Sequence, residues 1–244
     1  MLVLDNLTKR YNNVNVVNNL TLQVPKGKIF GFLGPNGSGK TTTIQMIMNL
    51  IRPESGHIYF NNKDIKMLLS ENKVSYIPDE PFYYGRLTGN EFIKFACACK
   101  EIEYTQISNK IKKLWESFRF SDKDRNKFIE EYSRGMKKKL NIIIAIINTP
   151  DFLIMDEPTE SLDPNATKVL KNYITNLKKN DCTVFLSTHL LDTAEYFCDF
   201  IGIIKEGNLI FNGSIETLKK NLKRPNSTLE EMFLQITGEE NLMM

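Results

Sequence analysis

The chain has 244 residues, of which 41% are hydrophobic, so it can bury the core of one large domain or of two small ones. Its 32 basic and 29 acidic residues leave a formal net charge of +3, which gives no electrostatic reason to expect nucleic acid as a partner. The four cysteines form no Cys-x-x-Cys pair and the two histidines lie far apart, which argues against zinc and favours buried free thiols in a reducing cytosol.

Apolar runs with β propensity alternate with segments of helical periodicity along most of the chain. Strands are predicted, in chain order, over residues 2–4, 14–17, 20–22, 29–33, 57–60, 74–77, 152–155, 183–186, 201–204 and 209–211. Helices are predicted over residues 42–50, 89–100, 106–118, 136–148, 167–178 and 190–197, with two short helices after residue 214. This alternation favours an α/β core with a largely parallel central sheet. The N-terminus is not expected to be a signal peptide, and no stretch reaches about 18–20 uninterrupted apolar residues, so no membrane-spanning helix is expected.

A glycine-rich segment follows the predicted strand 29–33 and opens the next predicted helix. It reads Gly34, Pro35, Asn36, Gly37, Ser38, Gly39, Lys40 and Thr41, followed by Thr42. Glycines at three positions let the backbone turn tightly and point its N–H groups at a polyphosphate. Lys40 adds a charge for the β- and γ-phosphates, and Thr41 adds a hydroxyl ligand for Mg²⁺. The segment therefore predicts a P-loop that binds a nucleotide together with Mg²⁺.

Two carboxylates follow the apolar strand 152–155, at the end of the strand where α/β folds bind ligands. Asp156 is placed to hold Mg²⁺ through its water shell, and Glu157 to orient and deprotonate a water that attacks the γ-phosphate. His189 follows the next strand in the run Ser187-Thr188-His189, where it can donate a hydrogen bond to a γ-phosphate oxygen. Taken singly, a strand that ends in solvated acids and a packed or surface histidine remain open alternatives.

Together, these ordered motifs resemble the nucleotide-binding subunit of ABC (ATP-binding cassette) transporters, over about residues 2–215. The resemblance implies ATP and Mg²⁺ as cofactors and ATP hydrolysis as the activity. It also implies one domain over residues 1–244: a RecA-like P-loop NTPase core at about 1–84 and 141–212 with an N-terminal antiparallel β portion, an inserted α-helical subdomain at about 85–140, and a short helical tail at 213–244.

Further site residues are implied by the same resemblance. Tyr11 matches the aromatic residue that stacks on adenine, although an ordinary tyrosine at a strand end is the alternative. The family signature, usually Leu-Ser-Gly-Gly-Gln, corresponds here to Tyr132, Ser133, Arg134, Gly135 and Met136. Its Ser133 hydroxyl and backbone N–H groups would bind the γ-phosphate held by a second copy. The lysines 137–139 that follow are interpreted as a solvated helix face. The D-loop corresponds to Ser161, Leu162 and Asp163, and His189 to the switch histidine.

Asp79 departs from the family pattern, because it stands where the family usually has a glutamine that ligates Mg²⁺ and contacts the membrane partner. A carboxylate can still ligate Mg²⁺, but it adds negative charge beside Asp156 and Glu157. The alternative is that Asp79 only caps the turn after Pro78.

The resemblance implies two such subunits that close head-to-tail over two ATP·Mg²⁺, as a homodimer or a heterodimer, and that power a separate membrane-spanning permease. We therefore expect a peripheral protein at the cytoplasmic face of the cell membrane, in a system that exports peptides, antibiotics or drugs, with no nucleic acid as partner. The alternatives are a soluble ABC ATPase that acts on ribosomes or nucleic acid, an ATP-gated dimerisation module with little hydrolysis, and an unrelated P-loop kinase.

Overall fold

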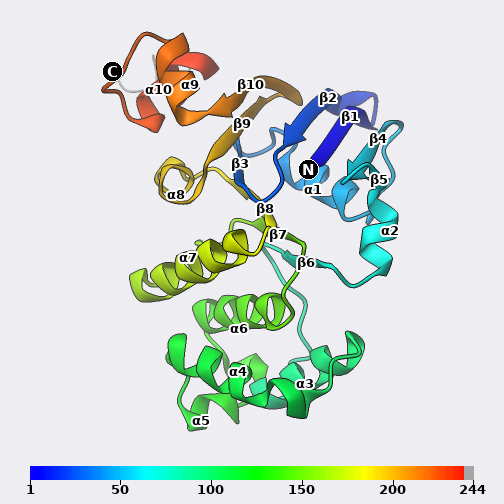
Figure 1. The fold of residues 1–244 in the computed structure, drawn as a ribbon, viewed down its shortest axis with the longest axis vertical. Coiled ribbons are helices and arrows are strands. Elements are labelled where there is room, and N and C mark those ends of the chain that lie inside the picture. The colour runs from blue at the N-terminus through cyan, green and yellow to red at the C-terminus, as the bar shows by residue number, and fades with distance from the viewer. Residues whose placement is uncertain (239–244) are drawn as a thin grey trace.

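The computed structural model describes residues 1–238 and contains a central six-stranded sheet (Figure 1). Its strands lie in the order β10-β9-β3-β8-β7-β6, and every neighbouring pair except β9 and β10 is parallel. Their bounds are β3 Ile29–Leu33, β6 Val74–Ile77, β7 Phe152–Asp156, β8 Thr183–Thr188, β9 Phe200–Lys205 and β10 Asn208–Ser214. Because helices cover both faces of a parallel sheet, its strands read as continuous apolar runs, and all residues of β3 and β7 are buried.

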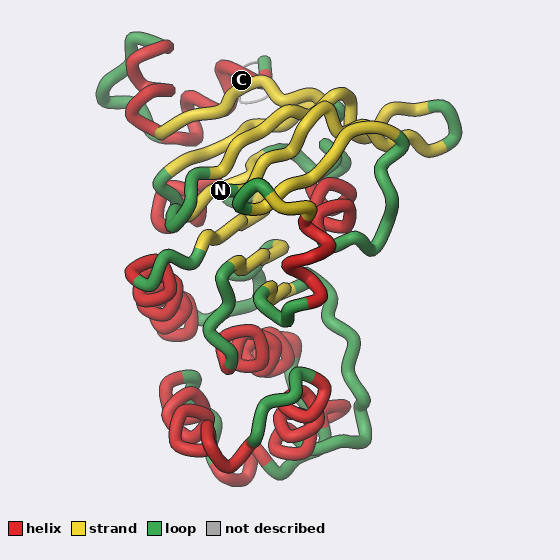
Figure 2. Tube along the Cα trace, turned by 45° about the vertical axis from the view of Figure 1, so that its right-hand side comes forward, coloured by secondary structure: helices red, strands yellow, loops and turns green. Residues whose placement is uncertain are grey.

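A second, four-stranded antiparallel sheet is built from the N-terminal part of the chain, in the order β2-β1-β4-β5 (Figure 2). Its strands are β1 Leu2–Tyr11, β2 Val14–Val24, β4 Ser55–Phe60 and β5 Lys63–Asp64. One buried cluster joins Leu4 and Val17 of this sheet to Phe32 and Phe185 of the central sheet. The two sheets therefore share a core, which also takes in helix α1 through Ile44.

The helices lie on the faces of the central sheet and at both ends of the molecule (Figure 1). Their bounds are α1 Lys40–Ile47, α2 Ile65–Ser70, α3 Gly89–Cys99, α4 Tyr104–Ser117, α5 Asp122–Arg125, α6 Arg134–Ile147, α7 Pro164–Lys179, α8 Leu191–Phe197, α9 Ile215–Asn221 and α10 Leu229–Thr237, with a 3₁₀ turn at Ile129–Glu131. Helices α6 and α7 pack against the sheet through residues such as Ile143 and Leu170, in the same cluster as Trp115 of α4. Helices α3, α4 and α5 lie beyond α6, at the end opposite to α9 and α10.

The predicted α/β class with a largely parallel central sheet is confirmed, and so are the hairpin of β9 with β10 and two short C-terminal helices. Other boundaries were wrong. The predicted strands 14–17 and 20–22 are one strand, β2, because β1 pairs along most of its length. The short helices α2 and α5 were not predicted, since each has too few residues to display a helical period.

The division into a core, a helical subdomain at 85–140 and a tail from 213 stays a prediction, and residues 239–244 of that tail lie outside the described residues. Helix α6 runs across residue 140 without interruption. Cys97 and Cys182 are buried as expected, whereas Cys99 is exposed. Within residues 1–238, no helix has the length and apolar character needed to cross a membrane.

Candidate active site

The P-loop connects β3 to α1, and its backbone conformation depends on glycine at Gly39. Gly39 caps α1 in the left-handed region, at φ +107°, and a Cβ atom built there would lie 2.5 Å from the carbonyl oxygen of Val16. Only glycine meets both conditions without strain. The loop therefore packs directly against β2, with its turn closed at the N-terminus of a helix, where N–H groups can bind phosphate.

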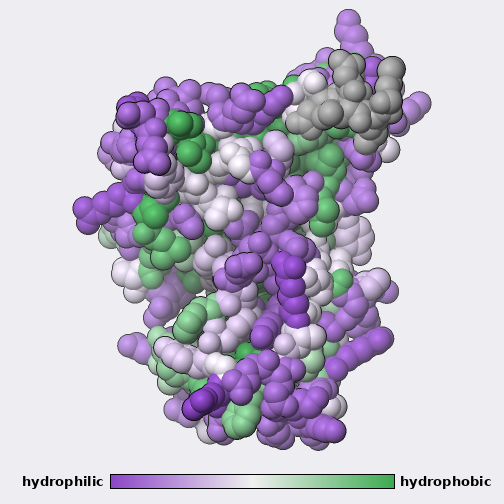
Figure 3. Space-filling view, turned by 180° about the vertical axis from the view of Figure 1, so that it is seen from behind, coloured by the Kyte–Doolittle hydropathy of each residue, from purple (hydrophilic) through white to green (hydrophobic). Residues whose placement is uncertain are grey.

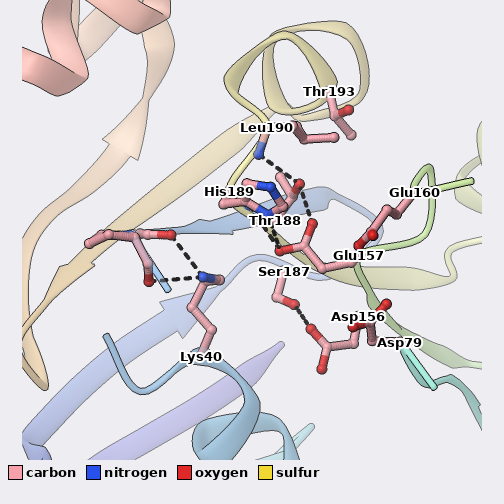
Figure 4. Close-up of polar contacts among 12 residues, drawn as sticks. Lys40, Asp79, Asp156, Glu157, Glu160, Ser187, Thr188, His189, Leu190 and Thr193 are labelled. Carbon is pink, nitrogen blue, oxygen red and sulfur yellow. Dashed lines mark hydrogen bonds and ion pairs between the residues drawn. The ribbon is translucent and has the colours of Figure 1, made fainter. Parts of the chain in front are cut away.

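Lys40 begins α1 and is buried, with its ammonium facing back into the loop (Figure 4). Its Nζ donates hydrogen bonds to the carbonyl oxygens of Gly34, at 2.7 Å, and Pro35, at 3.1 Å. Burial lowers the pKa of Lys40, and the nearby carboxylates of Glu157 and Asp156 oppose that shift. Since these acids hold the charge in place, Lys40 offers a cation at the position where a polyphosphate would reach the loop.

Asp156 ends β7 and forms hydrogen bonds with two neighbouring elements. Its Oδ2 accepts from the hydroxyl of Thr41 at 3.3 Å, and its Oδ1 accepts from the hydroxyl of Ser187 on β8. Burial is the main cause that raises the pKa of Asp156, with hydrogen bonds from Ser187 and Thr41 acting against it. These contacts hold a carboxylate beside the Thr41 hydroxyl, the two oxygen ligands predicted for Mg²⁺.

Glu157 follows at the turn after β7, and both of its oxygens are held by the last residue of β8 and the residue after it (Figure 4). Its Oε2 accepts from the Thr188 hydroxyl at 2.8 Å, and its Oε1 accepts from the backbone N–H of His189 at 3.0 Å. The Nδ1 atom of His189 lies 2.8 Å from the same Oε1. Glu157 also has a positive φ of 44°, an uncommon conformation for glutamate that costs about 1–3 kcal/mol and is typical of functional sites.

His189 lines a separate hollow, together with Leu190 and Asp192. The side chains of Lys40, Thr41, Asp156 and Glu157 face a common cavity of about 190 Å³. Its lining residues are Val16, Asn36, Gly37, Gly39, Lys40, Thr41, Thr42, Asp79, Asp156 and Glu157. The structure thus brings together the P-loop and the three acids at 79, 156 and 157, as the sequence predicted. Thr188 was missed as a partner of Glu157, although it stands directly before His189 in the run that the sequence singled out.

The donor set fits Mg²⁺, which prefers oxygen ligands and takes one or two carboxylates together with substrate phosphates. No cluster of three or more His, Cys, Asp or Glu side chains in residues 1–238 could hold a metal by itself. The loop also contains a buried hydroxyl, Ser38 Oγ, that has no hydrogen-bond partner among the described residues. A phosphate in the cavity would supply acceptors for such a group.

Tyr11 and the signature do not line this cavity. Tyr11 ends β1 with 45% of its surface exposed, and Lys9 Nζ lies 5.3 Å from its ring centroid. Ser133 is exposed and caps the N-terminus of α6, where its hydroxyl accepts from the backbone N–H of Met136 at 3.2 Å. The roles of Tyr11 in adenine stacking and of Ser133 in phosphate binding stay predictions.

The start of α6 is joined to the D-loop within the chain. Arg134 forms an ion pair with Glu160 at 2.9 Å, and Lys139 forms one with Asp163 at 2.5 Å. Between them, a Cβ atom on Gly135 would lie 2.7 Å from the carbonyl oxygen of Ser161. Asp163 also caps α7 by accepting from the backbone N–H of Ala166 at 2.8 Å, while Leu162 packs against the buried cluster around α6 and α7. Signature and D-loop therefore form one connected unit.

The interpretation of lysines 137–139 as a solvated face was wrong for Lys138, which is only 4% exposed. Its Nζ donates to the carbonyl oxygens of Pro78, at 3.3 Å, Asp79, at 3.4 Å, and Asp156, at 3.3 Å. Helical spacing contained the signal, because residue 138 precedes the buried Ile142 and Ile146 by one and two turns. The expected excess of negative charge at Asp79 is therefore offset, since Lys138 Nζ lies 3.7 Å from its Oδ1.

Comparison with known proteins agrees with this geometry. The family model described as ABC transporter matches residues 17–160. The lantibiotic transport ATP-binding protein SrtF of Streptococcus pyogenes is 31% identical over 233 residues, which cover 96% of each chain. The bacitracin transport ATP-binding protein BcrA of Enterococcus faecalis is 34% identical over 223 residues, which cover 90% of this chain and 71% of that protein.

A solved structure of the ATP-binding subunit of an ABC transporter is 29% identical and superposes with a TM-score of 0.89 over 97% of this chain and 99% of its own. The family match covers more than half of the chain, and the site contains the P-loop and the acids that phosphate-bond hydrolysis requires. The chain belongs to the ABC transporter family, as one of its ATP-binding, ATP-hydrolysing subunits.

Proposed function

We propose that this chain supplies the ATP hydrolysis for a separate membrane permease that exports peptides, antibiotics or drugs. Its relatives SrtF and BcrA, named for lantibiotic and bacitracin transport, support the class of cargo. The observation that carries the catalytic part is the position of Glu157, held by Thr188 and His189 at a cavity that also contains Lys40 and Asp156.

Each side chain of the site has a separate task in this proposal. Lys40 exchanges the carbonyl oxygens that it now binds for the β- and γ-phosphate oxygens of ATP. Thr41 and Asp156 hold Mg²⁺, which neutralises phosphate charge when bound. Glu157 orients the attacking water and accepts its proton, and His189 donates a hydrogen bond to a γ-phosphate oxygen.

The signature completes this site in a second copy of the subunit. Ser133 is exposed at the N-terminus of α6, and the residues that line the nucleotide cavity include none from 133–136. A helix N-terminus with free N–H groups is suited to bind an anion. Two subunits, identical or different, would therefore close head-to-tail, each adding its signature to the ATP held by the other.

The permease would dock on the aromatic surface next to Asp79, which we define as Phe82, Tyr84 and Phe95. These side chains are 80%, 51% and 43% exposed, and Tyr84 and Phe95 line a shallow hollow together with Leu87. Exposed aromatic groups of this kind mark interaction sites. On the face opposite to that of Figure 1, the surface is largely hydrophilic and its apolar residues gather in small groups (Figure 3). Docking here would keep the subunit at the cytoplasmic face of the membrane.

Co-expression with a candidate permease, a membrane-spanning protein encoded beside this chain, tests the proposal in a bacterium sensitive to peptide antibiotics. We expect resistance with the parental chain and none with Glu157→Gln. The variant Phe82→Ala should lose resistance and permease binding while it retains basal phosphate release. Leu50→Ala, which truncates another exposed apolar side chain, is the control and should behave as the parent. Salt-dependent binding to ribosomes or RNA with no effect of the permease would favour a soluble ATPase instead.

A further inference from the structure

Lys138 is a buried cation at the junction of three elements. It belongs to α6. The carbonyl oxygens that it binds belong to the segment directly after β6, at Pro78 and Asp79, and to the end of β7, at Asp156. Lysine is almost never fully buried unless its charge is paired. The burial of Lys138 therefore depends on these specific contacts, which a solvated lysine would not need.

Three carbonyl oxygens take up the three N–H donors of the Lys138 ammonium. The carboxylate of Asp79, with Oδ1 at 3.7 Å, is therefore its charge partner and not a hydrogen-bond partner. This Oδ1 is buried and has no hydrogen-bond partner among residues 1–238. Asp79, which lines the nucleotide cavity, thus has one buried oxygen without a hydrogen bond, and Lys138 compensates its charge.

Asp79 also lines a second cavity of about 250 Å³, on the side of the signature. Lys138 lines this second cavity as well, together with Arg134 and Glu160 of the ion pair described above. Lys138 therefore links the signature helix to the two chain segments that carry Asp79 and Asp156.

We propose that Lys138 is a positioning residue of the ATP site, with two separable effects. Its hydrogen bonds hold the ends of β6 and β7 together and so position Asp156 and, through the adjoining peptide, Glu157. Its charge offsets that of Asp79, so that a nucleotide anion in the cavity meets one uncompensated negative charge fewer. The inference rests on the ATP site proposed above, and it assigns Lys138 no contact with substrate.

The two effects predict different responses to substitution. Lys138→Met removes the charge and the donors but keeps an unbranched chain. Because one unit of negative charge is then uncompensated close to the cavity, the affinity for ATP in EDTA should fall about tenfold. Turnover at saturating ATP and Mg²⁺ should fall about tenfold or more, because misplacement of a catalytic group by a fraction of an ångström has effects of that size.

Asp79→Asn removes the charge partner, and the double variant Lys138→Met/Asp79→Asn tests the charge effect directly. The double variant should regain the parental affinity for ATP in EDTA, yet its turnover should stay low because the hydrogen bonds to the two strand ends are still missing. Lys138→Arg keeps both charge and donors and should retain most affinity and turnover. Lys113→Met removes the same charge from an exposed position of α4 and is the matched control.

A fluorescent ATP analogue titrated in EDTA and in Mg²⁺, together with steady-state phosphate release, gives both quantities, and thermal unfolding verifies that each variant is folded. ATP binding by the parent in the same titration establishes the underlying site. The inference is overturned if Lys138→Met binds ATP in EDTA and turns it over like the parent, or if affinity in the double variant stays as low as in Lys138→Met. If Lys138→Met does not fold, Asp79→Asn tests the charge effect by itself. This variant leaves the Lys138 charge uncompensated and must therefore bind ATP more tightly in EDTA. An unchanged affinity for ATP refutes the charge effect.

Discussion

Replacement of Glu157 by glutamine separates hydrolysis from nucleotide binding. The carboxylate oxygens accept three contacts in the structure: from the Thr188 hydroxyl, and from the backbone N–H and Nδ1 of His189. A glutamine retains one oxygen for the N–H of His189, and its NH₂ group can donate to Thr188 Oγ1. At most one hydrogen bond is lost, which corresponds to about 1 kcal/mol of folding free energy and a shift of about 2–4 °C in Tm.

The effect on hydrolysis should be much larger than the effect on stability. A neutral amide cannot accept the proton of the attacking water, and a positioned acid–base group contributes roughly 10²–10⁴-fold to the rate. This range corresponds to about 2.7–5.5 kcal/mol in activation free energy. Lys40, Thr41 and Asp156 are unaltered, so ATP should bind with the parental affinity, and the ATP-bound dimer should accumulate.

Steady-state phosphate release, ATP affinity and size-exclusion chromatography with ATP measure these three expectations. Glu116→Gln is the control, because it makes the same chemical change in an exposed glutamate of α4 that does not line the nucleotide cavity. The control should hydrolyse ATP at close to the parental rate. If Glu157→Gln turns over ATP like the parent, or if turnover falls equally in the variant and the control, Glu157 is not the catalytic base.

The remaining predictions concern the phosphates, the signature and adenine. Lys40→Ala should weaken ATP affinity and turnover together, since the ammonium acts in the ground and transition states alike; unchanged values of both contradict the P-loop assignment. Ser133→Arg should bind ATP as a monomer but neither dimerise nor hydrolyse it, and mixing with Lys40→Ala chains should restore part of the activity, because one composite site is then intact; no recovery in mixed dimers argues against shared sites. Gly135→Ala should lower turnover about ten- to hundredfold and retain ATP affinity. The added Cβ atom would lie 2.7 Å from the carbonyl oxygen of Ser161 and must displace the D-loop. Parental turnover would mean that this displacement does not affect catalysis. Tyr11→Ala should weaken ATP binding about three- to tenfold and Tyr11→Phe should not, as measured by titration; equal affinities identify Tyr11 as an ordinary strand-end residue.

The sequence was informative wherever a function depends on contiguous residues. The P-loop from Gly34 to Thr41 and the acids 156 and 157 lie within short segments whose spacing follows from the chemistry of phosphate and Mg²⁺. The strands β3 and β7 were predicted because a buried parallel strand must be apolar on both faces. Short elements such as α2 were missed, since their formation depends on neighbouring structure more than on their own pattern.

One ion pair and one buried lysine were decided by tertiary structure alone. Arg134 appears in the sequence only as a departure from the family signature, yet the fold pairs it with Glu160, 26 residues away. Lys138 appears among three lysines on a polar stretch, and its partners at Pro78 and Asp79 lie 60 and 59 residues earlier. Whether a charge is solvated or buried depends on the groups that surround it in space, and these come from segments that no local pattern includes.

The sequence by itself determined two features: a polyphosphate site at the start of a helix, and acids at the ends of neighbouring parallel strands. Both depend only on local spacing and on the alternation of strands with helices. The tertiary structure decided the electrostatic balance of the site. It placed the Lys138 ammonium behind Asp79, and Thr188 and the His189 N–H against Glu157. The physical reason is that a carboxylate's charge state and orientation are set by the donors and cations within a few ångströms, which only the folded chain brings together.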